Sequence, residues 1–140
     1  MIKIGITGGM GSGKSVVSSL FTVAGIPVYV ADDESKRLTE TSPVIRKKLK
    51  ALFGDDIYIN ESLDRKRLAS LIFSNVELLN KVNSIFHPVV KEDFKKWASK
   101  LSSKFCAMES AILFESGFDK YVDVVVTVDR KSTRLNSSHT

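Results

Sequence analysis

The sequence predicts an α/β fold, in which helices flank a parallel β-sheet. A β-branched run over residues 2–7 precedes a glycine-rich turn, and apolar residues then recur at helical spacing up to Gly25. Two further apolar runs, at residues 28–30 and 122–128, have the composition of buried strands. Strands that alternate with helical segments are typical of βαβ units. We therefore expect one α/β domain over residues 1–129.

The glycine-rich turn fits a phosphate-binding motif, G-x-x-x-x-G-K-[ST], called the P-loop. The match is Gly8-Gly9-Met10-Gly11-Ser12-Gly13-Lys14-Ser15. Glycines let backbone N–H groups point inward toward an anion, and the start of the following helix adds positive dipole. Lys14 is expected to reach the β- and γ-phosphates, and Ser15 to be a ligand of Mg²⁺. The predicted nucleotide-binding residues are Gly9, Gly11, Ser12, Gly13, Lys14, Ser15 and Val16.

Two aspartates, Asp32 and Asp33, come directly after the second expected strand. In an open α/β sheet this end of the strand is where ligands bind. A carboxylate there can orient an attacking hydroxyl, accept its proton or hold a water molecule on Mg²⁺. The alternative role is to cap a helix that begins near Glu34. We expect the functional role for Asp32 and the capping role for Asp33.

Several helices are predicted between the second and third strands, in a lobe over about residues 36–102. Their expected starts are Pro43 after Ser42, the Leu63-Asp64-Arg65 segment, the residues after Asn75, and Pro88. One crossover connection does not need so many helices. By analogy with other folds, extra helices beside a P-loop sheet form a lobe that holds the substrate.

Arg65 and His87 are the candidate substrate-binding residues of this lobe. The planar guanidinium of Arg65 suits a phosphate group, although a plain surface charge fits the sequence equally well. His87 stands between Phe86 and Pro88, where a structural histidine is the alternative to a substrate contact.

A third strand is expected over residues 104–109, and it ends in Glu109. At that place a Walker B acid would support Mg²⁺ from outside its first coordination shell. Glu109 fits a cap of the following turn as well, so both roles stay open.

Composition excludes several classes of protein. The net charge is +5, but without residues 130–140 the chain has 18 basic and 16 acidic residues, so a nucleic-acid surface is not expected. The lysines at 47, 48 and 50 fit a solvated helix face. No apolar run has the length of a membrane span. The single cysteine, Cys106, favours a reducing, cytoplasmic setting.

Taken together and in this order, the segments resemble the bacterial dephospho-CoA kinase family over residues 1–129. The matching segments are residues 6–15 for the family's P-loop, 28–32 for its second strand, 63–65 and 87–88 for its helical lobe, and 111–115 for its Pro-Leu-Leu-hydrophobic-Glu segment. The chain departs from the family pattern at Val16, Val30, Lys36 and Ala111. None of these departures removes Lys14, Ser15 or Asp32.

The resemblance implies transfer of the γ-phosphoryl group of ATP to the ribose 3′-hydroxyl of dephospho-CoA, with Mg²⁺. Lys14 and Asp32 are then the catalytic residues, and Asp32, Arg65 and His87 contact the substrate. The expected partner is this small molecule, and the expected state is a monomer or weak oligomer. The alternatives are another small-molecule or nucleoside monophosphate kinase, or a nucleotide-binding fragment without activity.

Residues 130–140 contain one large apolar residue and no helical or strand period. We expect a disordered, non-native tail there. The resemblance implies that the family's last strand and arginine-bearing lid, which follow this point, are missing from the chain.

Overall fold

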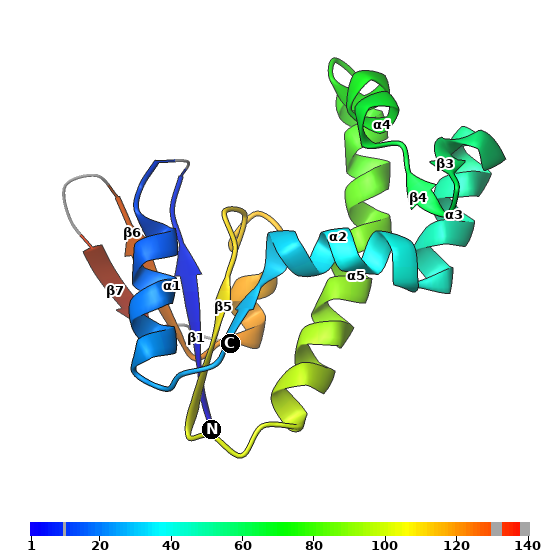
Figure 1. Cartoon of the computed structure of the whole chain (residues 1–140). Helices are drawn as coiled ribbons and strands as arrows, with labels where there is room; N and C mark the ends of the chain where they lie inside the picture. The colour runs from blue at the N-terminus through cyan, green and yellow to red at the C-terminus, as the bar shows by residue number, and fades with distance from the viewer. Residues whose placement is uncertain (10, 130–132, 138–140) are drawn as a thin grey trace. The chain divides into compact units, whose positions relative to one another are not determined.

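The computed structural model describes residues 1–9, 11–129 and 133–137, and the chain divides into two compact units (Figure 1). Unit 1 consists of Met1–Asp32 and Asp93–Thr140, and unit 2 consists of Asp33–Glu92. The phosphate-binding motif therefore belongs to unit 1, and most of the helical segment belongs to unit 2.

Unit 1 contains a five-stranded sheet with the strand order β2-β5-β1-β6-β7. Its first four strands are parallel, which confirms the predicted sheet. They are β2 (Val28–Val30), β5 (Phe105–Glu109), β1 (Ile2–Thr7) and β6 (Val124–Val128). Helix α1 (Lys14–Val23) follows β1 and packs Val17 and Phe21 against a core of Ile6, Ala107 and Val128.

The fifth strand, β7 (Thr133–Ser137), pairs antiparallel with β6. Its register begins at Val128↔Thr133 and ends at Val124↔Ser137. This strand lies within the segment 130–140 that the sequence predicts to be disordered, and residues 130–132 and 138–140 lie outside the described residues. Backbone pairing explains the difference, because the N–H and C=O groups along an edge strand accept a neighbour without requiring an apolar period.

The register brings the carboxyl ends of three strands to one edge of the sheet. Glu109 at the end of β5 is paired with Ile6 of β1 on one side and with Val30 of β2 on the other. The segments that follow β1 and β2 therefore leave the sheet from the same edge. This is the edge where ligands bind in parallel α/β sheets.

Helices form most of unit 2, as the sequence predicts. They are α2 (Ala31–Thr41), α3 (Pro43–Phe53), α4 (Arg65–Ile72) and the first part of α5 (Val76–Ser99). The short helix η1 (Asp55–Ile57) leads into the hairpin of β3 (Tyr58–Ile59) and β4 (Ser62–Leu63), and in unit 1 the short helix η2 (Phe118–Tyr121) precedes β6.

Three predicted helix starts in this lobe are confirmed by their capping bonds. Ser42 Oγ accepts from the Ile45 N–H at 3.3 Å, and Asp64 Oδ1 accepts from the Arg67 N–H at 3.2 Å. Asn75 Oδ1 accepts from the N–H of Leu78 at 3.0 Å. Each side chain satisfies a backbone donor that has no partner inside the helix.

The prediction that Pro88 starts a new helix is wrong. Pro88 lies inside α5, which runs without interruption over 24 residues. A proline removes one backbone hydrogen bond from a helix, but buried side chains on both sides of it hold α5 together. These are Val82, Val90, Phe94 and Ala98.

The last part of α5 belongs to unit 1, whereas the sequence places the lobe over about residues 36–102. An aromatic cluster explains this boundary. The buried ring of Tyr29 in β2 contacts Phe94 and Trp97 edge-on, with centroids 5.4 and 5.5 Å apart. The Tyr29 hydroxyl also donates to Asp93 Oδ2 at 2.8 Å. These contacts fix residues 93–97 to the sheet.

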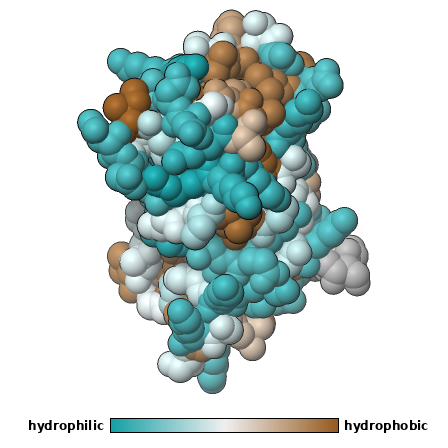
Figure 2. All heavy atoms as spheres, turned by 90° about the vertical axis from the view of Figure 1, so that its right-hand side faces the viewer, coloured by the Kyte–Doolittle hydropathy of each residue, from teal (hydrophilic) through white to brown (hydrophobic). Residues whose placement is uncertain are grey.

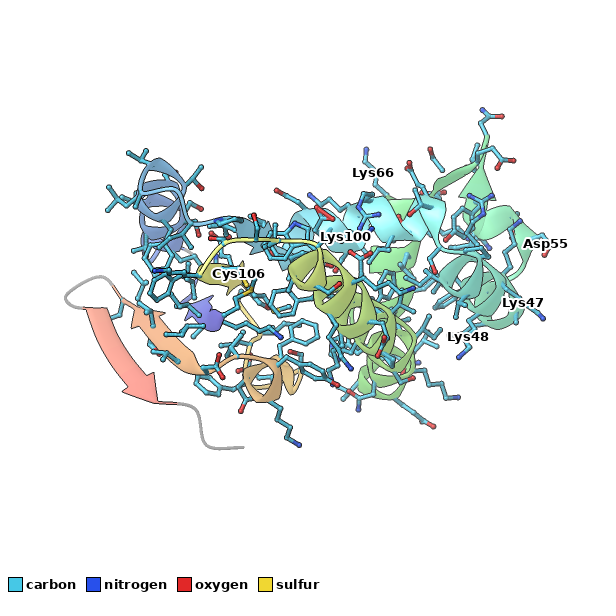
Figure 3. All side chains as sticks on the ribbon, turned by 90° about the horizontal axis from the view of Figure 1, so that it is seen from below. Lys47, Lys48, Asp55, Lys66, Lys100 and Cys106 are labelled. Atoms are coloured by element: carbon cyan, nitrogen blue, oxygen red, sulfur yellow. The ribbon has the colours of Figure 1, made fainter. Side chains whose placement is uncertain are left out.

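The face of unit 2 that Figure 2 shows is mainly hydrophilic, with an apolar patch at the end where α4 meets α5. The exposed apolar residues there are Leu71, Phe73, Val76 and Leu79. Lys47 and Lys48 are exposed on α3 and point away from it, as expected for a solvated face (Figure 3).

Cys106 is fully buried in β5 and is not in a disulfide. Its burial raises the pKa of the thiol, which keeps it protonated. Among the described residues, no helix combines the length and apolar character that a membrane span requires.

Candidate active site

The glycine-rich turn between β1 and α1 has the backbone conformation that its glycines predict. Gly11 and Gly13 have φ values of 76° and 92°, in the left-handed region that favours glycine. Gly13 is the residue before α1, and it has no side chain to cap the helix. No side chain therefore competes with an anion at the start of α1, and the helix dipole attracts an anion there.

Gly8 is the point of closest approach in this turn. A Cβ atom there would lie 2.4 Å from the Val128 carbonyl oxygen and 2.6 Å from Ser12 Oγ. Gly9, by contrast, has open space around the same position. Gly8 thus lets the turn pass directly over the end of β6, a role that the motif alone does not assign.

Ser12 contributes an unusual polar atom to the turn. Its Oγ is the buried side-chain oxygen that lacks a hydrogen-bond partner within the described part of the chain. A buried hydroxyl without a partner costs free energy, which a ligand can recover by accepting its proton. With the uncapped helix start, this donor fits a phosphate group.

Lys14 and Ser15, the first two residues of α1, stand where the motif predicts them. Lys14 is half-buried, and Ser15 is exposed. The Val16 N–H donates to the Gly13 carbonyl at 3.0 Å, so that bond closes the first turn. Lys14 and Ser15 thus bring an ammonium and a hydroxyl group to the first turn of α1, directly after the glycine turn.

Asp32 lies exposed in the first turn of α2, two residues beyond the end of β2. The expected helix start near Glu34 is wrong, because α2 begins at Ala31 directly after the strand. Asp33 is therefore inside the helix and is not its N-cap. Carboxylates in a first helical turn are favoured by the helix dipole, which explains why the acidic pair tolerates helical backbone.

Glu109 is buried at the centre of the same edge, with an exposed fraction of 7%. Its Oε1 accepts a hydrogen bond from the hydroxyl of Ser18, a buried residue in the second turn of α1. Sequence reasoning did not single out Ser18. No local signal marks it, since its partner is 91 residues away along the chain.

Among the residues that the structure describes, no three His, Cys, Asp or Glu side chains gather as a metal cluster. Mg²⁺ does not require one, because it keeps several waters and binds through few protein groups together with substrate phosphates. The Ser15 hydroxyl suits this kind of site.

Arg65 lies at the start of α4 in unit 2, where its guanidinium makes contacts within the lobe. Its NH2 group donates to Thr39 Oγ1 at 3.1 Å and to the Lys36 carbonyl at 3.3 Å. The residue remains exposed, so part of its donor fork faces solvent.

His87 is partly buried in α5, also in unit 2. Burial lowers the pKa of its imidazole, and the nearby Lys91 lowers the pKa further. His87 is therefore neutral near pH 7.

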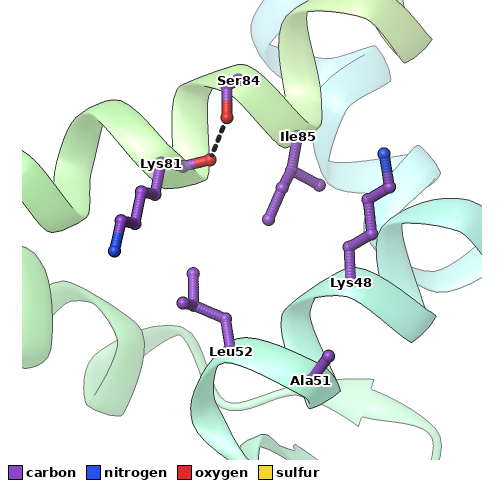
Figure 4. Close-up of a pocket in the computed structure, with 6 residues that line it drawn as sticks. All are labelled: Lys48, Ala51, Leu52, Lys81, Ser84 and Ile85. Carbon is purple, nitrogen blue, oxygen red and sulfur yellow. Dashed lines mark hydrogen bonds between the residues drawn. The ribbon is translucent and has the colours of Figure 1, made fainter.

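Unit 2 also has an open hollow of about 390 Å³ between α3 and α5 (Figure 4). Leu52 and Ile85 point into it, and Lys48 and Lys81 flank it. The Ser84 hydroxyl at its wall donates to the Lys81 carbonyl at 2.6 Å. The lining residues include neither Arg65 nor His87, so the hollow is separate from the predicted substrate contacts.

Comparison with known proteins agrees with this geometry. The family model described as dephospho-CoA kinase matches residues 2–136. A dephospho-CoA kinase of Porphyromonas gingivalis is 55% identical over 129 residues, which are 92% of this chain and 64% of that protein. One from Bacteroides fragilis is 51% identical over 128 residues, or 91% of this chain and 62% of that protein.

Two solved structures share the fold. The crystal structure of TT1252 from Thermus thermophilus has a TM-score of 0.78 at 34% identity, covering 91% of this chain and 65% of that one. Dephospho-CoA kinase from Campylobacter jejuni has a TM-score of 0.64 at 19% identity, covering 89% of this chain and 64% of that one. The second likeness concerns the fold alone.

The chain spans less than two thirds of the length of the curated relatives described above. The family match nevertheless includes the glycine turn, the segments that follow β2 and β5, and the helical lobe. The chain belongs to the dephospho-CoA kinase family.

Proposed function

We propose that this protein transfers the γ-phosphoryl group of ATP to the 3′-hydroxyl of dephospho-CoA, with Mg²⁺. The observation that carries the proposal is the glycine turn, where the buried Ser12 hydroxyl has no hydrogen-bond partner among the described residues and the start of α1 has no side-chain cap. The family match supports the choice of substrate.

The turn would bind the phosphates of ATP through charge and hydrogen bonds. Backbone N–H groups and the Ser12 hydroxyl donate to phosphate oxygens, and Lys14 neutralises charge on the β- and γ-phosphates. Mg²⁺, held with the help of the Ser15 hydroxyl, supplies further neutralisation of the phosphate oxygens. The predicted contacts of this turn are Gly9, Gly11, Ser12, Gly13, Lys14, Ser15 and Val16.

Asp32 would act on the acceptor alcohol. Its exposed carboxylate, at the same sheet edge as the turn, can accept a hydrogen bond from the hydroxyl and then its proton. In phosphoryl transfer the main contributions are positioning and electrostatic stabilisation, so orientation by Asp32 matters as much as proton removal.

Arg65 and His87 would hold the substrate from the helical lobe. The solvent-facing donors of Arg65 suit a phosphate oxygen. Because His87 is neutral near pH 7, we assign it hydrogen bonding and no ion pair. We further propose a cytoplasmic monomer or weak oligomer with no nucleic-acid or membrane partner.

A panel of acceptors tests the proposal. The protein is incubated with ATP and Mg²⁺ together with dephospho-CoA or a nucleoside monophosphate, and both ADP and the phosphorylated acceptor are measured. CoA formation that exceeds the other products supports the proposal. Preference for a nucleoside monophosphate favours another kinase activity, and ATP binding without transfer favours a nucleotide-binding fragment.

A further inference from the structure

The hydrogen bond between Ser18 and Glu109 joins α1, the helix of the phosphate turn, to the carboxyl end of β5, the strand between β1 and β2. Both residues are 7% exposed, and Ser18 Oγ donates to Glu109 Oε1. A carboxylate is seldom this buried unless a partner satisfies it. The Ser18 hydroxyl is the partner that satisfies Glu109 in the structure.

Ser18 differs from its neighbouring hydroxyls on α1. Ser19 and Thr22 donate to the carbonyls of Ser15 and Ser18 in their own helix, each at 3.0 Å. Ser18 instead donates outside the helix, to a strand. This bond therefore orients α1 relative to the sheet, which the other two cannot do.

The position of Ser18 connects the bond to the phosphate turn. Ser18 lies four residues after Lys14 and three after Ser15, so its side chain is one helical turn from each of theirs. At the other end, Glu109 is paired with Val30, two residues before Asp32. The bond thus connects α1, which carries the proposed phosphate-binding residues, to β5, which is paired with the strand that precedes Asp32.

Stability alone is a poor explanation for the pair. Burial of an ionised carboxylate is costly, and well-packed apolar residues often replace buried polar pairs without loss of stability. Directional bonding is what a hydroxyl–carboxylate pair adds and an apolar pair lacks.

We infer that Ser18 and Glu109 are positioning residues, which hold the first turn of α1 so that Lys14 and Ser15 face the nucleotide at the edge that carries Asp32. The inference rests on the proposed function for its role in transfer. Its effect on nucleotide binding can be measured separately.

The test compares Ser18→Thr with Ser18→Val. Threonine and valine have nearly the same shape, so packing changes are matched and only the hydroxyl differs. We expect Ser18→Thr to retain the affinity for ATP with Mg²⁺, and Ser18→Val to raise Kd about tenfold relative to it. The valine variant should also melt at a lower temperature, because Glu109 loses its buried partner, so both Kd values are measured well below the two melting temperatures. Where transfer occurs, kcat should fall in the valine variant and be restored in the threonine variant.

Equal Kd values in the two variants would overturn the inference. Absence of transfer in the unaltered protein would refute the proposed function, while the Kd comparison would still decide on the pair. If neither variant at position 18 folds, Glu109→Gln and Glu109→Met ask the same question. Glutamine keeps the acceptor and methionine removes it, so a Kd increase confined to Glu109→Met is expected and equal values would overturn the pair.

Discussion

The phosphate turn of unit 1 and the helical lobe of unit 2 differ in whether their polar groups have hydrogen-bond partners within the protein. In the turn, Ser12 Oγ and the start of α1 have donors that no side chain satisfies. In the lobe, Arg65 donates to Thr39 and Lys36, and the Tyr58 hydroxyl donates to the Thr39 carbonyl at 2.6 Å. The comparison separates groups prepared for a ligand from groups that first hold their own unit together.

The largest expected effect tests the proposed base. Asp32→Asn should lower kcat for transfer by about 10² to 10⁴, because the amide cannot accept the hydroxyl proton. Affinity for ATP should change little. Asp33→Asn is the matched control, since Asp33 is the next residue of the same helix and is also exposed. Equal losses in the two variants would remove the assignment of Asp32.

The second prediction concerns the backbone of the turn. Gly8→Ala should destabilise the protein by about 1–3 kcal/mol, because its Cβ would overlap the Val128 carbonyl oxygen. Gly9→Ala meets no atom within 4 Å and should have a much smaller effect. Chemical denaturation of both variants measures the difference. Similar unfolding free energies would show that the turn relaxes at Gly8.

The third prediction tests whether Arg65 of the helical lobe contacts the substrate. Arg65→Ala should raise KM for dephospho-CoA about tenfold, as expected for a lost charge-assisted bond, and leave KM for ATP unchanged. Arg67→Ala is the control, because Arg67 lies on the same helix as Arg65 and forms a surface ion pair with Asp56 of η1 at 2.8 Å. A fall in stability without a change in KM would assign Arg65 to structure alone.

The smallest effect is a pH dependence at His87. Its pKa is lowered in the folded state, so the unfolded chain binds the proton more readily. Stability contributed by neutral His87 is therefore complete above about pH 6.5 and decreases as the pH falls below that value.

Unfolding free energies of the protein and of His87→Gln, measured from pH 7.5 to 5, check this sign. The glutamine variant should lose less stability toward acid. Identical slopes would mean that His87 does not titrate differently on folding.

Local sequence signals were enough to predict the parallel strands of the sheet, the phosphate turn and three helix caps of the lobe. The glycine motif has a fixed spacing, and Ser42, Asp64 and Asn75 act on backbone groups three residues away. These features depend on neighbours in the chain, so composition and spacing reveal them.

Features that depend on distant contacts were not predictable in the same way. The interior position of Pro88 reflects buried side chains along α5, and tertiary packing overrides the helix-start preference of proline. The Ser18–Glu109 bond joins two separate segments, and β7 is defined by its pairing with β6. No period in either segment encodes such a partner.

The most direct test of the central claim is calorimetric titration of the 140-residue chain with ATP and Mg²⁺, comparing the unaltered protein with Lys14→Ala. Lys100→Ala, which removes an exposed lysine from unit 1, is the control. We expect binding to the unaltered and control proteins and at least about a tenfold higher Kd for Lys14→Ala, from loss of a charged contact to phosphate. Equal Kd values in all three proteins, or no binding to the unaltered chain, would contradict it.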